Sequence, residues 1–263
     1  MAAEGYRMLF ASTDFKLDHE QHFLEEFQNR TVDGLIVLLA DETAERSVEL
    51  LKRSRVPVVL IDRDVVAPLD FVLSDHKTAM TQVVRYLMSL GHTKIGLIVP
   101  PMTMRPGRER FNAFCAEMLL RGHPTLEGYI RTAIQTPEEG YRAAIDILRH
   151  PDRPTALIVG ANQHIFGAMR AVRELNLSIP GELSIVGADE NVASGLIEPP
   201  LTVIWRDMNL VGESAARLLL DRLGSRAAEP PRTITIRSEI ILRESCGPAP
   251  TNTEPRGTRL GGE

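Results

Sequence analysis

The sequence has few cysteines, few aromatic residues and no long apolar run. Its two cysteines among 263 residues, Cys115 and Cys246, have neither metal-ligand spacing nor the density of a disulfide scaffold. No window approaches the roughly 18 consecutive apolar residues that a membrane span needs, and the first residues lack the basic and apolar regions of a signal peptide. We therefore expect a cytoplasmic protein with two reduced thiols and no membrane contact.

Positive charge and catalytic motifs are also missing. The formal net charge is −5, without the clustered Lys and Arg that a duplex-binding module normally shows. There is no phosphate-cradling loop, no dinucleotide-binding glycine pattern and no nucleophile turn. His19 and His22 could share a helix face, but flanking acids favour a solvated surface over a metal site. The sequence therefore predicts no enzyme, no cofactor and no metal.

What the sequence does contain is a regular alternation of apolar runs and helical patterns. With 43% hydrophobic residues it can bury a substantial core, as one large domain or two lobes. Alternation of this kind implies parallel sheets with right-handed crossovers, an α/β fold. Strands are predicted at 6–11, 35–40, 58–61, 71–73, 94–99, 129–133, 156–159, 183–186, 203–205 and 233–241, and helices at 42–53, 77–90, 108–121, 136–148 and 208–223.

Residues 154–202 form the most informative stretch. The apolar run 156–159 is followed by a helical pattern and then by a second apolar run, 183–186, which together predict strand, helix and strand. Ligands gather just outside the carboxyl ends of parallel strands, and the two strands are followed by Asn162 and Asp189. These two residues are the first candidates for a binding site.

Several short phrases, in this order along the chain, resemble the effector-binding and dimerisation domain of LacI/GalR-family transcriptional regulators. They are VDGLI at 32–36, PVVLIDR at 57–63, LGH at 90–92, GY at 140–141, PTA at 154–156, IP at 179–180, VGAD at 186–189, PPLT at 199–202 and LRES at 242–245. Each phrase is weak alone, but the ordered set covers nearly the whole chain.

The resemblance implies a periplasmic-binding-protein type I-like fold, with two Rossmann-like lobes joined by three crossovers and a small ligand in the cleft. We expect the first lobe at 1–100 plus 203–224, truncated at its start, and the second at 101–202 plus 225–246. Residues 247–263 are rich in Gly, Pro and polar residues and are expected to form a disordered tail. Family members begin with a helix-turn-helix that is absent from this sequence, so operator DNA is expected to bind only through that missing segment.

Three candidate ligand contacts fall in the second lobe. Arg110 lies where the resemblance places an arginine that clamps ligand hydroxyls or anionic groups; the alternative is an exposed helix arginine. Asp189 ends the family's Gly-aromatic-Asp phrase with Ala188 in place of the ring, and it could bind hydroxyls or shape a turn. Asn162 matches an Asn-Asp pair with Gln163 in place of Asp, and it could instead cap the next helix.

Two further candidates bear on the ligand class. Asp75 could contact ligand from the first lobe, although capping the helix near residue 77 is slightly favoured. Gln135 stands where many relatives place an aromatic ring, so a stacked planar ligand is in doubt. The resemblance therefore favours a small polar effector such as a sugar or sugar acid.

A homodimer contact is expected at Phe166, Leu196 and Ile197. The core stripe of the helix around residue 166 leaves Phe166 rotated partly outward. Leu196 and Ile197 lie in a loop before two prolines, where large apolar side chains usually need a partner. The resemblance places a dimer contact at both positions.

Two functions remain open from the sequence. The leading one is a ligand sensor for transcription, a repressor in many relatives, in which effector binding alters the DNA-binding state of a dimer. The alternative is a solute-binding protein of a sugar transport system, which shares the fold but is exported.

Overall fold

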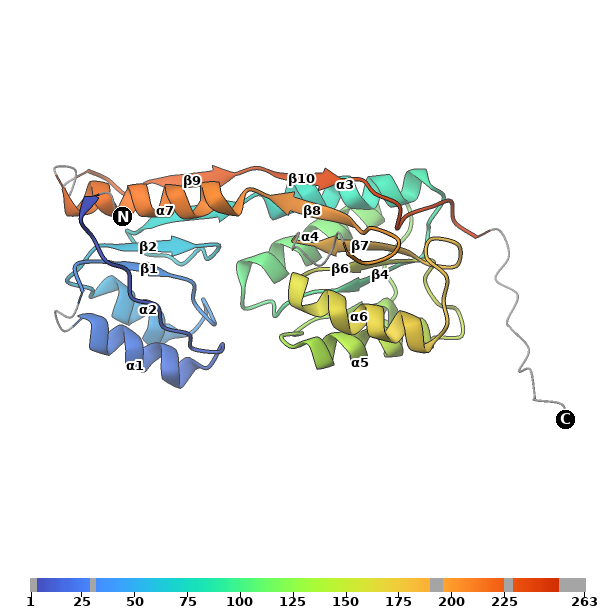
Figure 1. The fold of residues 1–263 in the computed structure, drawn as a ribbon, viewed down its shortest axis with the longest axis horizontal. Coiled ribbons are helices and arrows are strands. Elements are labelled where there is room, and N and C mark those ends of the chain that lie inside the picture. The colour runs from blue at the N-terminus through green and yellow to red at the C-terminus, as the bar shows by residue number, and fades with distance from the viewer. Residues whose placement is uncertain (1–3, 29–31, 190–195, 225–228, 251–263) are drawn as a thin grey trace, which may run out of the picture. The chain divides into compact units, whose positions relative to one another are not determined.

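The computed structural model describes residues 4–28, 32–189, 196–224 and 229–250, and the chain divides into two compact units (Figure 1). Each unit is assembled from separate stretches of sequence. Unit 1 comprises Met1–Thr78, Pro101–Glu109 and Arg206–Glu239, and unit 2 comprises Ala79–Pro100, Arg110–Trp205 and Ile240–Glu263. Among the described residues, no helix combines the length and apolar character needed to cross a membrane.

Unit 1 is built on a four-stranded sheet in the order β1-β2-β3-β9, in which every neighbouring pair is parallel. Its strands are β1 (Leu35–Val37), β2 (Val58–Ile61), β3 (Asp70–Ser74) and β9 (Thr233–Ile236). Its helices are α1 (Leu17–Gln28), α2 (Glu45–Lys52) and α7 (Met208–Leu223). Within this unit α1 and α2 contact each other, and α7 packs on all four strands.

The all-apolar strand β2 shows why this sheet is covered on both faces. Successive side chains of a strand point to opposite faces. Val58 and Leu60 join the core under α1 and α2, whereas Val59 and Ile61 join the core under α7. A continuous apolar run, rather than an alternating one, is what a buried parallel strand requires.

Unit 2 contains a six-stranded sheet in the order β10-β8-β7-β6-β4-β5. Its strands are β4 (Ile95–Ile98), β5 (Ile130–Arg131), β6 (Ala156–Val159), β7 (Ser184–Ala188), β8 (Thr202–Arg206) and β10 (Ser238–Ile241). The helices are α3 (His76–Ser89), α4 (Arg105–Leu120), α5 (Pro137–Leu148) and α6 (Asn162–Glu174), with a short 3-10 helix at Glu127–Tyr129. The division into units falls within four elements, because α3, α4 and β10 begin in unit 1 and β8 ends there.

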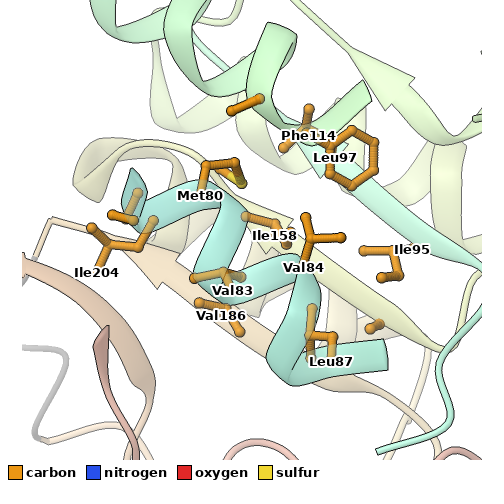
Figure 2. Packing of buried hydrophobic residues seen from close by; sticks show 14 of the residues in the cluster. Met80, Val83, Val84, Leu87, Ile95, Leu97, Phe114, Ile158, Val186 and Ile204 are labelled. Atoms are coloured by element: carbon orange, nitrogen blue, oxygen red, sulfur yellow. The ribbon is translucent and has the colours of Figure 1, made fainter. Parts of the chain in front are cut away.

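The core of unit 2 lies in two layers on either side of β6. Ile158 packs with Val83 and Val84 of α3 and with Phe114 of α4 (Figure 2). Its neighbour Leu157 packs on the other face, in the cluster formed with α5 and α6. Helices α3 and α4 therefore cover one face of this strand, and α5 and α6 cover the other.

Local sequence signals account for several helix ends. Thr136 Oγ1 accepts a hydrogen bond from Glu139 N at 3.2 Å, and Glu139 Oε2 accepts one from Thr136 N at 3.0 Å, which forms a capping box with Pro137 at the first turn of α5. Gly91 and Gly122 follow α3 and α4 with φ values of 92° and 76°, as left-handed helix caps require.

Helices α5 and α6 lie so close together that a glycine is required between them. A Cβ at Gly167 would stand 2.0 Å from Pro137 O and 2.6 Å from Tyr141 N. We expect Gly167→Ala to lower the free energy of unfolding by about 1 to 3 kcal/mol, because backbone must shift to admit the methyl group. Urea unfolding would measure this effect.

Gly212→Ala is the matched control, because Gly212 lies in α7 and a Cβ there meets nothing within 4 Å. In an open helix position alanine should stabilise by up to about 1 kcal/mol. Equal effects of the two substitutions would contradict the steric explanation.

The expected strand at 6–11 is wrong. Residues 6–11 have no strand assignment, and Met8, Leu9 and Phe10 are exposed. An extended segment becomes a strand only when a neighbour satisfies its N–H and C=O groups, and no strand in the described part of the chain pairs with it. An apolar run alone therefore did not decide the assignment.

The sheet memberships differ from the expected lobes. Strand β4, expected in the first lobe within 1–100, lies in the sheet of unit 2, where Ile95 aligns with Ala156 of β6. Strand β8, expected in the first lobe within 203–224, pairs with β7, and β9, expected in the second lobe, pairs with β3. Which sheet a strand joins depends on its long-range partners, which apolar periodicity does not specify.

The expected tail at 247–263 is wrong for its first residues. The carbonyl of Gly247 lies 3.0 Å from the Nε2 atom of buried His92, and Gly247 N donates to Ser184 Oγ at 3.1 Å. Ala249 N donates to Leu90 O at 2.8 Å. These contacts anchor a segment whose composition alone predicted disorder. Residues 251–263 lie outside the described residues.

Candidate functional site

The carboxyl edge of the unit 2 sheet carries the residues that follow β6 and β7. Strand β6 ends at Val159 and is followed by Gly160, and β7 ends at Ala188 and is followed by Asp189. The two strands are parallel neighbours, so their ends meet at one edge. Arg110 reaches the same edge from α4.

Arg110 and Asp189 form a buried ion pair. Arg110 is 1% exposed, and its Nη2 donates to Asp189 Oδ1 at 3.1 Å while its Nη1 donates to Gly160 O at 2.5 Å. The Asp189 side chain is 17% exposed, against 2% for that of Arg110. The exposed-helix alternative for Arg110 is therefore wrong, and the carboxylate is the part of the pair that solvent reaches.

Backbone geometry positions both partners of the pair. Asp189 has φ = 65°, a left-handed conformation that Asp tolerates better than most residues. Its N–H donates to Ile204 O at 3.1 Å. A Cβ at Gly160 would lie 2.6 Å from Ile98 O, so only glycine brings the carbonyl under Arg110 to this place. Sequence reasoning missed Gly160, although a glycine directly after a strand was a usable signal.

A buried histidine lies beside this pair. His164 on α6 is fully buried, and burial, followed by the positive charge of Arg110, lowers its pKa to about 4. The imidazole is therefore neutral at pH 7. A lone histidine within a helical pattern gave no sequence signal for this position.

Gln135 and Asn162 lie on the segments around the start of α6. Gln163 Nε2 donates to the backbone oxygen of Gln135 at 2.7 Å, and Gln135 N donates to Glu139 Oε2 at 2.8 Å. Asn162 is exposed at the first position of α6, whereas the cap position is Ala161. The capping alternative for Asn162 is therefore not what the structure shows.

Asp75 belongs to unit 1, where its Oδ1 accepts a hydrogen bond from Thr78 N at 3.0 Å. This is the capping interaction expected for the first turn of α3. A role in ligand binding for Asp75 rests on the family resemblance.

Unit 1 contains a second buried charge cluster, centred on Asp62 after β2. Asp62 accepts from Ser74 N at 2.7 Å and lies 3.4 Å from His76 Nε2, and Arg206 pairs with its other oxygen. Burial alone would raise the pKa of Asp62, but His76, Arg206 and the Ser74 N–H together hold that pKa well below its ordinary value. Sequence reasoning used this aspartate only as part of a family phrase.

The first turn of α4 is tied to the same region of unit 1. Arg105 Nη1 lies 4.0 Å from Asp62 Oδ1, and its Nη1 donates to Ser74 O at 2.8 Å. Arg108 pairs with Glu42 and, at 2.6 Å, with Asp64. Residues from three separate stretches of unit 1 therefore meet at Asp62 and Asp64.

The residues expected at a dimer contact differ in exposure. Phe166 is 50% exposed and Leu196 is 77% exposed, as an unpartnered surface requires. Ile197 is half-buried and packs against the core cluster of α5 and α6, so it is available only in part. The dimer itself stays a prediction.

No group of three or more His, Cys, Asp and Glu side chains within the described ranges could hold a metal ion. His19 and His22 are largely exposed and lie 4.0 Å and 3.9 Å from Asp18 and Glu26.

Comparisons with known proteins identify the family. A profile of the periplasmic binding protein-like domain matches residues 84–246. The HTH-type transcriptional repressor PurR of Escherichia coli is 29% identical over 250 residues, which cover 94% of this chain and 73% of the repressor.

Solved structures agree with this result. A regulatory protein of the LacI family from Chloroflexus aggregans is 25% identical with a TM-score of 0.78, over 94% of this chain and 88% of that one. A LacI family regulator from Enterococcus faecium with bound ribose is 24% identical with a TM-score of 0.77, over 87% and 85% of the two chains. These relatives are transcriptional regulators, in agreement with the expectation of no enzymatic function. The chain belongs to the periplasmic binding protein-like domain family, in the form that serves LacI-type transcriptional regulators as their effector-binding domain.

Proposed function

We propose that this domain senses a neutral sugar at the carboxyl edge of the unit 2 sheet, and that the bound sugar controls DNA binding by the full-length regulator. The Arg110–Asp189 pair carries this proposal. The partly exposed carboxylate of Asp189 accepts hydrogen bonds from ligand hydroxyls, and the buried guanidinium of Arg110 holds that carboxylate in place. Arg110 thus acts mainly by orienting Asp189.

Charge balance at this edge favours a neutral sugar over a sugar acid. The positive charge of Arg110 is compensated by Asp189, and His164 is neutral at pH 7 because its pKa is about 4. A ligand carboxylate would bring an uncompensated negative charge beside Asp189, and partial burial makes such repulsion costly.

Three other residues complete the proposed ligand contacts. Asn162 is exposed beside Gly160, and Gln135 is joined to the start of α6 through Gln163. Neither residue offers an aromatic face, which suits a ligand recognised by hydrogen bonds. Asp75 is proposed as a contact from unit 1 on the resemblance alone.

Calorimetric titration with paired ligands tests the proposal. Each neutral pentose or hexose would be compared with the uronic or aldonic acid of the same sugar, using the domain at pH 7. Binding of a neutral sugar with a much weaker response to its acid is the expected result. Tight binding of an acid, and of no neutral partner, would contradict the assignment of ligand class.

The domain is further proposed to act as a cytoplasmic homodimer, with operator DNA bound by a helix-turn-helix outside this sequence. PurR, which matches 94% of this chain, is a repressor, and this supports a repressor role here. The reported relatives are regulators, and the transport alternative has no observation of its own in its favour.

We expect Phe166→Glu to shift the protein from dimer toward monomer in light scattering. Phe166 and Leu196 are exposed apolar side chains, and a carboxylate at position 166 would have to be desolvated on association. Leu119→Glu is the matched control, because Leu119 is exposed on α4 and is assigned to no interface. An unchanged dimer in Phe166→Glu, or an equal loss in Leu119→Glu, would count against this contact.

A further inference from the structure

A cavity of about 280 Å³ opens in unit 2 near the ends of α3 and α4. Its walls contain no carboxylate, although the whole chain carries a net charge of −5. The lining residues are Arg85, Met88, Ser89, His92, Thr93, Arg121 and His123. None of them belongs to the sugar site proposed above.

Two arginines of this cavity share one carboxylate. Arg85 Nε and Nη2 donate to Glu117 at 2.9 and 3.1 Å, and Arg121 Nε donates to Glu117 Oε1 at 2.9 Å. Glu117 stays ionised, because hydrogen bonds from Arg85 above all hold its pKa below the ordinary value. Two guanidinium charges against one carboxylate leave a net charge of +1 at the cavity.

Both arginines are half-exposed and keep donors that Glu117 does not use. The Glu117 side chain is 4% exposed, whereas those of Arg85 and Arg121 are 53% and 48% exposed. A guanidinium has five N–H donors, and the hydrogen bonds to Glu117 use two on Arg85 and one on Arg121. The buried carboxylate therefore orders two half-exposed arginine side chains, each of which keeps donors that Glu117 does not use.

His92 contributes shape rather than charge. Its ring nitrogens contact Thr155 Oγ1 at 2.8 Å and Gly247 O at 3.0 Å, and burial lowers its pKa. The carbonyl groups at the ends of α3 and α4 accept backbone hydrogen bonds, since His92 N donates to Leu87 O and His123 N donates to Met118 O. Their carbonyl groups therefore oppose an anion less than open helix ends would.

We propose that this cavity binds the phosphoryl group of a small metabolite. The planar donor pairs of a guanidinium match the oxygens of a tetrahedral phosphate. The phosphate dianion is attracted by the net charge of +1 at the cavity and outweighs it. Thr93 also lines the cavity, and its hydroxyl can donate to a further phosphate oxygen, whereas the Ser89 hydroxyl donates to Tyr86 O at 2.7 Å. A polymeric phosphate is disfavoured, because the net negative charge of the chain repels a long anion.

Titration of the domain with inorganic phosphate tests the proposal. Amide chemical shifts of the isotopically labelled protein would be followed at constant ionic strength, with chloride as the reference anion. Arg121→Gln should weaken phosphate binding by about tenfold, the loss of one charge-assisted contact at a half-exposed site. Thr93→Glu should weaken it at least as much, and it leaves both arginine pairs with Glu117 intact, so it decides the matter if Arg121→Gln folds poorly.

Arg142→Gln is the control, because Arg142 is an exposed arginine of the same unit whose ion pair with Glu138 is 3.5 Å long. It should bind phosphate as the parent protein does. Equal weakening in Arg142→Gln would show general surface attraction, and phosphate shifts no larger than those of chloride would show no site; either result overturns the proposal.

Two further arms identify the source of the phosphoryl group. Glycerol 3-phosphate should compete with inorganic phosphate, and glycerol should not. Binding to phosphatidic acid vesicles without competition by glycerol 3-phosphate would overturn the assignment to a small metabolite. The cavity shares no residue with the proposed sugar contacts, so a failure of the sugar proposal leaves this one separately testable.

Discussion

Arg110→Ala is expected to weaken binding of a neutral sugar by roughly ten- to hundredfold, the equivalent of about 1.5 to 3 kcal/mol for a charge-assisted hydrogen bond. The substitution releases the Asp189 carboxylate from the Nη2 atom that holds it and empties a fully buried space. It should also lower the free energy of unfolding by about 3 kcal/mol. This value is the lower end of the usual cost of removing one partner of a buried ion pair, because Asp189 is partly solvated. Calorimetry and urea unfolding measure the two effects.

A double variant separates ligand binding from stability. Arg110→Met with Asp189→Leu replaces both charges by apolar side chains, which is often neutral for stability when a buried pair is exchanged as a whole. We expect unfolding close to that of the parent protein with sugar binding still lost. Sugar binding that survives in Arg110→Ala, or that returns in the double variant, would contradict the role of this pair.

Asp62→Asn is expected to destabilise unit 1 by about 3 to 5 kcal/mol at pH 7, the usual cost of removing one member of a buried charge cluster. The amide cannot compensate Arg206 and Arg105, and it offers one acceptor where the carboxylate offers two. Urea unfolding at pH 7 measures the loss.

The loss should depend on pH with a definite sign. The pKa of Asp62 in the folded protein lies below its ordinary value of 3.8, so the carboxylate stabilises the fold above that value. This contribution is lost as the pH falls from about 4 toward the folded-state pKa. The difference between Asp62→Asn and the parent protein should therefore shrink as the pH falls below 4. A difference that grows below pH 4 would contradict this assignment.

Asp70→Asn is the matched control for position 62. Asp70 is also buried and accepts from Arg222 Nε and Nη2 at 2.7 and 2.8 Å. Hydrogen exchange should quicken around β3 and the end of α7 in that variant. In Asp62→Asn it should quicken together at three sequence stretches, those of His76, Arg105 and Arg206, because Asp62 contacts all three.

The local features of this fold follow from short-range sequence signals. The apolar run of β2 predicts a strand buried on both faces, and the residues from Thr136 to Glu139 predict the capping box of α5. Asp189 could be found as a polar residue at the end of a strand. Such features depend on the side-chain period and on hydrogen bonds within one turn, which a single stretch of sequence contains.

Long-range pairing needed the tertiary structure. Strand β4 joins the sheet of unit 2, residues 6–11 pair with no described strand, and Gly247 is held by His92. The sequence could not predict the bond between Arg110 and the Gly160 carbonyl, or the cluster around Asp62, because the partners are many residues apart in sequence. Apolar period and helix caps specify what a segment can become, whereas the strand or charge that it meets is selected by the free energy of the whole packed chain.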